Sequence, residues 1–249
     1  MPAFVLRKTH FVSFEYARRR RMIRWIKAWH RSNTLTVSGH CTERQNRNRA
    51  SYQFKSKMKK TLIINGHPDK ESFNFALADA YKKGAVSSGA EIKEIVVRDL
   101  DFNPNLQFGY RKRTELEPDL IDAQQKIKWA EHIVLIYPVW WGSIPAIMKG
   151  FIDRVFLPGF AFQKRENSVW WDKLLTNKSA RIISTLDQPA WYYWLIYRQP
   201  SNNAMKKLTL QFSGINPVYV TTIGPIRLSK EMYRQNWLNK IEKLGQQNK

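Results

Sequence analysis

The sequence predicts an α/β protein built on a parallel sheet of five strands, in the order 2-1-3-4-5, with helices on both faces. Two observations lead to this prediction. From Lys60 onward, short apolar β-prone segments alternate with longer segments of helical periodicity, which requires crossover connections between parallel strands. The segment HIVLIY is apolar without interruption, as is typical of a strand covered on both faces. We therefore expect a three-layer sandwich.

The predicted strands are short and bounded by turn residues or by helical segments. They span residues 61–65, 91–97, 132–137, 180–186 and 217–222. Helices are predicted at residues 73–86, 119–129, 144–156, 190–212 and 229–244, and a loop at 98–117. In a sheet of this order, ligands bind beyond the carboxyl ends of the strands, at the switch point between the first and third strands. The residues at those ends should therefore carry the chemistry.

Positive charge is concentrated near the amino terminus. The chain has a formal net charge of +22, and residues 1–57 hold 14 Lys and Arg against 2 Asp and Glu. Three interpretations of this segment stay open. It is a disordered basic leader, or a functional arm for targeting, a membrane surface or nucleic acid, or residues upstream of a true start at Met58. We predict a basic extension at 1–57 and one domain at 58–249.

Composition argues against several classes of protein. Cys41 is the only cysteine, so no internal disulfide and no oxidising compartment are implied. The uncharged run from Ile133 to Met148 is shorter than the roughly 20 apolar residues that a spanning helix needs, and prolines interrupt it. The five histidines show no metal-ligand spacing. We expect a cytoplasmic protein without a metal centre or a transmembrane segment.

Polar residues follow the first strand, in GHPDKESFN. Ser72 is a suitable N-cap for the next helix, with Asn74 close behind, and a helix start at this edge of a sheet is suited to a phosphate. Neither GxGxxG nor GxxxxGK[ST] occurs. His67 has two interpretations, as a ligand to a phosphate or ribityl chain or as a residue that satisfies backbone groups in a turn.

An aromatic turn follows the third strand. Pro138 ends the strand, and Trp140, Trp141 and Gly142 come where a ligand would lie. Two aromatic faces beside exposed backbone amides would suit a flat conjugated ring. The alternative is that the tryptophans pack in the core.

Polar residues and an aromatic run follow the fourth strand. Thr185 and Asp187 offer polar contacts, and AWYYWLIY comes next. Aromatic residues at helical spacing usually belong to a core or a subunit interface. Trp191 and Tyr192, which lie nearer the strand end, are the stronger candidates for the site.

Two motifs carry a family resemblance, GHPDKESFNFA and YPVWWGSIPAIMKGFIDRVFLPGFAF. Together with the β–α spacing, they make residues 58–245 similar to the flavodoxin-like NAD(P)H:quinone oxidoreductases, which include DT-diaphorase, modulators of drug activity and ancillary subunits of potassium efflux systems. The resemblance implies a flavodoxin-like fold, a bound flavin (FMN or FAD), NAD(P)H as co-substrate and a quinone-like acceptor. It also implies two half-reactions at one site, in a ping-pong sequence, and a homodimer, for which AWYYWLIY is the candidate surface.

The resemblance assigns roles to particular positions. The phosphate and ribityl chain of the flavin would be held by His67, Ser72, Phe73 and Asn74. The ring would lie against Pro138, Val139, Trp140, Trp141 and Gly142, and its polar edge would meet Thr185, Leu186 and Asp187. Tyr192 matches a tyrosine that aids hydride transfer in the larger members. Those members have Thr-Thr-Gly-Gly where this chain has Ser-Thr-Leu-Asp at 184–187, so side chains replace the close backbone approach that glycine permits.

Two alternatives belong to other classes. One is a regulatory or ancillary subunit, for example of a potassium efflux system, with secondary redox activity. The other is a nucleic-acid-binding protein, which the charge of +22 suggests. Residues 58–249 contain no aromatic-basic RNA motif and no helix-turn-helix signature, so no specific nucleic-acid partner is expected.

Overall fold

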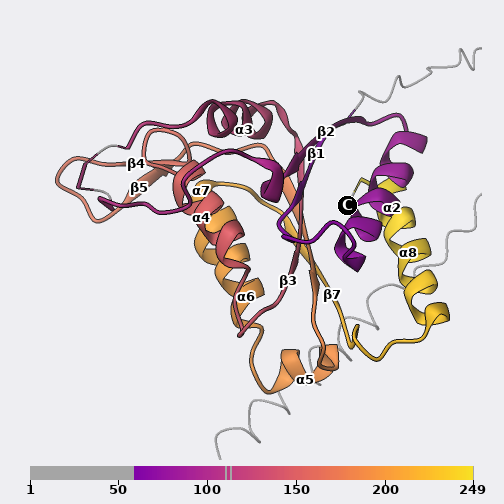
Figure 1. Cartoon of the computed structure of the whole chain (residues 1–249). Coiled ribbons are helices and arrows are strands. Elements are labelled where there is room, and N and C mark those ends of the chain that lie inside the picture. Colours follow the sequence, from indigo (N-terminus) through magenta and orange to yellow (C-terminus); the bar gives the residue numbers. More distant parts are fainter. Residues whose placement is uncertain (1–58, 110, 113, 249) are drawn as a thin grey trace, which may run out of the picture. The chain divides into compact units, whose positions relative to one another are not determined.

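The computed structural model describes residues 59–109, 111–112 and 114–248 of the chain. The predicted basic extension and Met58 lie outside the described residues. Figure 1 shows a twisted central sheet with helices on both sides. Its five strands are β1 (Lys60–Asn65), β2 (Glu91–Val96), β3 (His132–Pro138), β6 (Ser179–Thr185) and β7 (Val218–Ile223).

All neighbouring strands of this sheet are parallel, and their order is β2-β1-β3-β6-β7. Numbered within the sheet alone, this is the predicted order 2-1-3-4-5, and the predicted fold class is confirmed. Strand β3 at the centre is buried along its whole length, as its continuous apolar sequence predicts. The register aligns Asn65 with Ile136 and Pro138 with Thr185, so the carboxyl ends of β1, β3 and β6 meet at one edge.

Helices α2 (Phe73–Ser87) and α8 (Glu231–Gln246) cover one face of the sheet (Figure 1). Their core includes Ile63, Val134, Leu77 and Ile241, with the strand residues in register on that face. The two helices approach so closely at Gly84 that a Cβ atom there would lie 1.9 Å from the carbonyl oxygen of Glu242. Only a glycine allows that backbone contact.

The other face is covered by α3 (Pro118–Trp129), α4 (Ala146–Val155) and the segment α6 (Pro200–Asn203), η2 (Ala204–Leu210) and α7 (Gln211–Ser213), as Figure 1 shows. Leu62, Ile133 and Leu135 belong to the core on this side. Because strand side chains alternate between faces, neighbouring residues of β1 and β3 serve two separate cores. No helix in the described residues is long and apolar enough to cross a membrane.

The predicted helix at 190–212 is interrupted. The structure has α5 (Ala190–Leu195) and then a break before α6, where Arg198 and Gln199 take positive φ angles of 59° and 54°. Pro200 explains the break, because its ring disfavours a helical residue before it and it has no N–H for a continuous helix. After α6 the backbone is π-helical through η2.

Other differences from the predicted elements are local. A short helix, η1 (Val97–Asp99), follows β2, and a hairpin of β4 (Phe162–Lys164) and β5 (Trp171–Lys173) lies between α4 and β6. Helix α4 begins after Pro145, which occupies its N-cap. None of these differences changes the order of the strands in the sheet.

The amino edge of the sheet holds a buried histidine. His132 is 0% exposed, its Nδ1 lies 2.8 Å from Ser179 Oγ, and its ring stacks on Tyr81. Burial, helped by the positive charges of Lys59 and Arg181, lowers the pKa of His132 from 6.5 to about 3.

This pKa predicts how stability depends on pH. As pH falls below 6.5, His132 becomes protonated in the unfolded chain, whereas in the folded chain it stays neutral until about pH 3. The free energy of unfolding should therefore fall with a slope of up to about 1.4 kcal/mol per pH unit for this one proton. Denaturant unfolding at several pH values measures the slope. In the variant His132→Gln, the free energy of unfolding should depend less steeply on pH over that range, by the contribution of this one proton. An equal slope in both proteins would contradict the prediction.

Candidate flavin site

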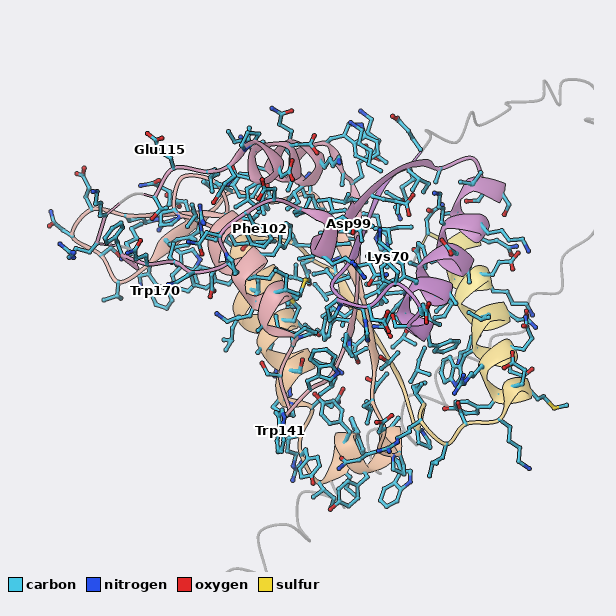
Figure 2. The ribbon with its side chains drawn as sticks, viewed as in Figure 1. Lys70, Asp99, Phe102, Glu115, Trp141 and Trp170 are labelled. Carbon is cyan, nitrogen blue, oxygen red and sulfur yellow. The ribbon has the colours of Figure 1, made fainter. Side chains whose placement is uncertain are left out.

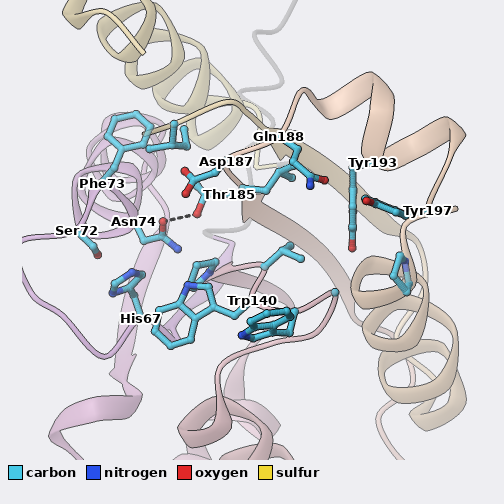
Figure 3. A pocket seen from close by; sticks show the side chains of 17 residues that line it. His67, Ser72, Phe73, Asn74, Trp140, Thr185, Asp187, Gln188, Tyr193 and Tyr197 are labelled. Atoms are coloured by element: carbon cyan, nitrogen blue, oxygen red, sulfur yellow. Dashed lines mark hydrogen bonds between the residues drawn. The ribbon is translucent and has the colours of Figure 1, made fainter. Parts of the chain in front are cut away.

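A cavity of about 780 Å³ opens at the carboxyl edge of the sheet, between the loops that follow β1, β3 and β6. Figure 3 shows its side chains converging from these loops, from α5 and from the segment after α5. All twelve residues predicted to hold the cofactor line it, and further lining comes from five residues outside that set. The lining is His67, Ser72, Phe73, Asn74, Pro138, Val139, Trp140, Trp141, Gly142, Thr185, Leu186, Asp187, Gln188, Tyr193, Tyr197, Pro200 and Ile226.

The loop between β1 and α2 is shaped by its own polar side chains. Asn65 Oδ1 accepts the backbone N–H of His67, His67 Nδ1 accepts that of Asp69, and Asp69 Oδ1 accepts that of Glu71, each at 3.0 Å. Such side-chain turns hold a loop in one conformation without regular structure. They bring the chain from the strand end to the first turn of α2 at the wall of the cavity.

His67 satisfies a backbone group of the turn, which is one of the two interpretations that the sequence left open. Its role as a ligand to a phosphate or ribityl chain stays a prediction. Its Nδ1 is an acceptor within the turn, so the neutral ring in this arrangement carries its proton on Nε2. Burial lowers the pKa of His67, against the opposing effect of the Asp69 carboxylate. The ring is therefore neutral at pH 7. It also lines the cavity, edge-on to Trp140 with the ring centres 5.7 Å apart.

The start of α2 offers hydrogen-bonding groups to the cavity. Ser72 occupies the N-cap, yet its hydroxyl makes no capping bond. Among the described residues, Ser72 Oγ and Asn74 Nδ2 are buried polar atoms without a hydrogen-bond partner. Asn74 is fixed from its other end, where Oδ1 accepts a bond of 2.8 Å from Thr185 Oγ1 (Figure 3). Buried polar groups are rarely left unpaired, so this corner suits the oxygens of a ligand.

The turn after β3 presents tryptophan to the cavity and to solvent. Val139 N–H bonds to the carbonyl of Thr185 at 2.7 Å, and Trp140 and Ser143 exchange backbone bonds of 3.0 and 2.8 Å. Between them Trp141 and Gly142 take positive φ angles of 50° and 72°, the geometry of a two-residue turn. Trp140 is 44% exposed and Trp141 fully exposed. Neither tryptophan packs in the core, so the core interpretation of this pair was wrong.

The loop after β6 closes the third side. Thr185 and Leu186 are buried, and Asp187 is exposed. Asp187 Oδ1 accepts the backbone N–H of Arg227 at 3.0 Å. This bond ties the loop to the segment after β7, which contributes Ile226 to the lining.

Helix α5 and the segment after it add residues that the sequence did not assign to the site. Tyr193 is buried and accepts the N–H of Ser201 on its hydroxyl at 3.1 Å. Tyr197 lies one helical turn further on and also lines the cavity, so the i, i+4 spacing was a usable signal. Tyr192 is not part of the lining, and its ring lies edge-on to Tyr197 at 5.2 Å. Its catalytic role stays a prediction.

Two of the unassigned residues come from distant elements. Pro200 begins α6 and Ile226 follows β7, and nothing in the sequence next to either one points to a site. Across the described residues, no group of three or more His, Cys, Asp or Glu side chains could hold a metal ion.

A parallel sheet with this order and a pocket at its switch point defines a doubly wound α/β protein of the kind that binds nucleotides and flavins. Comparison with known families identifies it further. The family model described as a flavodoxin-like fold matches residues 59–246, so the chain belongs to that family. The resemblance seen in the motifs is confirmed.

Named relatives agree with this assignment. The chain is 28% identical over 125 residues to rat "NAD(P)H dehydrogenase [quinone] 1", covering 42% of this chain and 46% of the relative. It is 27% identical over 178 residues to an "Uncharacterized NAD(P)H oxidoreductase" of Haemophilus influenzae, covering 70% and 88%. The crystal structure of Smu.1420 from Streptococcus mutans is 28% identical, with a TM-score of 0.66 over 76% of this chain and 99% of that one. The chain spans about half the length of the first curated relatives it matches.

Proposed function

We propose that this protein is a flavin-dependent NAD(P)H oxidoreductase that delivers a hydride from NAD(P)H, through the flavin, to a quinone-like acceptor. The observation that carries the proposal is the cavity of about 780 Å³ at the switch point, where an aromatic turn faces a helix start with unpaired polar atoms. This volume is within the usual range for cofactor sites. The relatives named for NAD(P)H and quinone support the substrate class.

The residues present fit a flavin. Ser72 Oγ and Asn74 Nδ2 lack partners among the described residues, and the first-turn N–H groups of α2 favour an anion such as the flavin phosphate. Trp140 supplies an aromatic face at the third strand end, and the backbone of the turn supplies hydrogen-bonding groups. Among the described residues, no Lys or Arg side chain belongs to the lining. Binding would therefore depend on neutral donors and helix geometry.

A bound flavin supplies the redox chemistry, and the chain supplies binding, orientation and exclusion of water. The neutral His67 keeps an N–H donor on Nε2 at the cavity wall, and Thr185 holds the Asn74 amide in one orientation. The remaining open volume would take NAD(P)H and the acceptor in turn, which is the ping-pong sequence. NAD(P)H gives up a hydride, and the acceptor gains that hydride with one solvent proton.

The visible spectrum of the purified protein tests the proposal. We expect flavin absorption, or its appearance on incubation with FMN or FAD, and loss of that absorption on anaerobic addition of NADH or NADPH. Acid release and mass measurement identify the flavin. Steady-state rates with a quinone should give parallel double-reciprocal lines. A colourless protein that takes up neither flavin would refute the proposal.

A further inference from the structure

A row of polar side chains crosses the sheet near its carboxyl edge. Tyr137 of β3, Ser184 of β6 and Thr222 of β7 are paired in register on neighbouring strands. Residues paired in this way project from the same face of a sheet. The next residues along β3 and β6, Pro138 and Thr185, line the cavity. The polar row therefore lies one residue away from the cavity lining.

Asn202 of α6 bonds to this row and is only 2% exposed. Its Oδ1 accepts the hydroxyl of Tyr137 at 3.3 Å, and its Nδ2 donates to Thr222 Oγ1 at 2.9 Å and to Gln199 Oε1 at 3.4 Å. Thr222 Oγ1 also accepts Ser184 Oγ at 3.3 Å. Both N–H donors of the amide are thus used. A buried network that is paired in this way fixes one arrangement of the elements it joins.

Helix α6 also connects to one wall of the cavity. The backbone N–H of Ser201, next to Asn202, donates to the hydroxyl of Tyr193 at 3.1 Å. Tyr193 and Pro200 line the cavity. Figure 3 shows Tyr193 on the side of the cavity opposite Ser72. The network at Asn202 therefore reaches the wall that faces the start of α2.

The backbone before α6 needs such support. Arg198 and Gln199 have positive φ angles of 59° and 54°, a conformation that residues other than glycine seldom adopt. Gln199 is held by its side-chain bond to Asn202 and by its N–H, which donates to the carbonyl of Tyr193 at 3.2 Å. In Figure 2 the labelled Trp141 of the cavity lining lies at the same end of the sheet as α5, which leads into this strained segment. Strain of this kind persists only where the surroundings fix it, and it is common at functional sites.

We propose that Asn202 is a positioning residue for the ring end of the proposed flavin site. It holds α6 against the sheet, and α6 holds Tyr193 and Pro200 at the cavity wall opposite the start of α2. The inference rests on the proposed function, which puts the flavin ring at the aromatic turn and the phosphate at α2. Asn202 itself is not part of the cavity lining, so it acts through its neighbours. Loss of its amide should weaken binding of the ring and leave the contribution of the phosphate unchanged.

Fluorescence titration of the full chain with riboflavin and with FMN tests the proposal. We expect Asn202→Ala to weaken binding of both flavins by the same factor, at least about tenfold, because the buried groups that it pairs lose their partner. A second pair of variants removes and restores one bond of the network. Thr222→Val lacks the hydroxyl that accepts from Asn202 and should weaken binding of both flavins. Thr222→Ser keeps the hydroxyl and should bind them within about twofold of the parent.

Ser179→Ala is the matched control. Ser179 Oγ lies 2.8 Å from Nδ1 of the buried His132, at the first residue of β6 and so at the opposite edge of the sheet from the cavity. The control removes a hydrogen bond to a buried group without touching α6. Its affinity for both flavins should stay within about twofold of the parent. Thermal unfolding without flavin checks that every variant is folded.

Three results would overturn the proposal. The first is a folded Asn202→Ala that binds both flavins as tightly as the parent. The second is an equal loss of affinity in Ser179→Ala, which would assign the effect to general destabilisation. The third is a loss for FMN without a loss for riboflavin, which would assign the effect to the phosphate. If Asn202→Ala does not fold, equal affinities of Thr222→Val and Thr222→Ser would overturn it instead.

The proposed function fails by a different result. A parent that takes up neither riboflavin, FMN nor FAD would refute the flavin site, and with it the role of Asn202. A parent that binds flavin while the variants show no difference would refute the role of Asn202 alone. The titrations contain neither NAD(P)H nor an acceptor, so they do not depend on the proposed reaction.

Discussion

Replacing Glu117 with alanine is expected to lower the free energy of unfolding by about 3–5 kcal/mol, because it leaves a buried charge without its partner. Arg154 on α4 is only 1% exposed. Its Nη1 and Nη2 donate to the two carboxylate oxygens of Glu117 at 3.2 and 2.7 Å, and Nη2 donates to the carbonyl of Glu115 at 2.9 Å. Nη1 also donates to the carbonyl of Asn103. The arginine thus fastens the loop before α3 to α4.

The control is a pair on the same helix. Lys149 and Asp153 form an ion pair at 2.6 Å, with side-chain exposures of 57% and 34%. Pairs in solvent are worth little, so Asp153→Asn should change the stability by less than about 0.5 kcal/mol. Denaturant unfolding followed by circular dichroism measures both variants. Similar losses in the two would mean that the burial of Arg154 is not what makes the first pair matter.

The pH dependence gives a second measurement of the same pair. Burial alone would raise the pKa of Glu117, but the Asn103 N–H, its own backbone N–H and the Arg154 guanidinium hold it below its ordinary value. A lowered carboxyl pKa contributes stability above the unfolded-state pKa, and that stability is lost as pH falls through the folded-state value. The parent should therefore lose this contribution on the acid side, and Glu117→Ala should show no such loss.

The fold was predictable because its information is local. Each strand and most helices follow from the period and composition of a few neighbouring residues, as HIVLIY shows for β3. Pro200 also indicated the break after α5, but the helical composition of the residues around it favoured one continuous helix. The burial of Arg154 was not predictable in this way. It depends on a loop that returns to α4 from residues 37 to 51 positions away.

Some residues of the site were also predictable from local sequence, and others were not. Residues at the ends of β1, β3 and β6 meet because neighbouring parallel strands end at one edge, so their position in the sequence placed them in the cavity. Tyr193 lies within the aromatic run, but successive side chains of a helix point in different directions. The sequence therefore did not show which aromatic residue of the run faces the cavity. Ile226 comes to the cavity through the segment after β7, and only the tertiary structure reveals it.

Replacing Asn74 with aspartate is expected to weaken flavin binding by at least about 100-fold, or about 2.7 kcal/mol, if the proposed site is correct. Asn74 is 2% exposed and lines the cavity, and its Nδ2 has no partner among the described residues. Aspartate keeps the shape and still accepts the bond from Thr185 Oγ1. It removes the donor and places a negative charge beside the start of α2, where a phosphate would bind.

Fluorescence titration of the flavin measures the change. Asn239→Asp is the matched control, since it adds the same charge to an exposed position of α8 away from the cavity lining, and its affinity should stay within about twofold of the parent, because an exposed distant charge is screened. Thermal unfolding without flavin checks that Asn74→Asp is folded. If the folded variant binds FMN and FAD as tightly as the parent, the cofactor's phosphate does not lie at the start of α2. The aromatic turn would then hold the ring without help from the phosphate. A parallel titration with riboflavin, which has the same ring system and no phosphate, would in that case give an affinity as high as that for FMN.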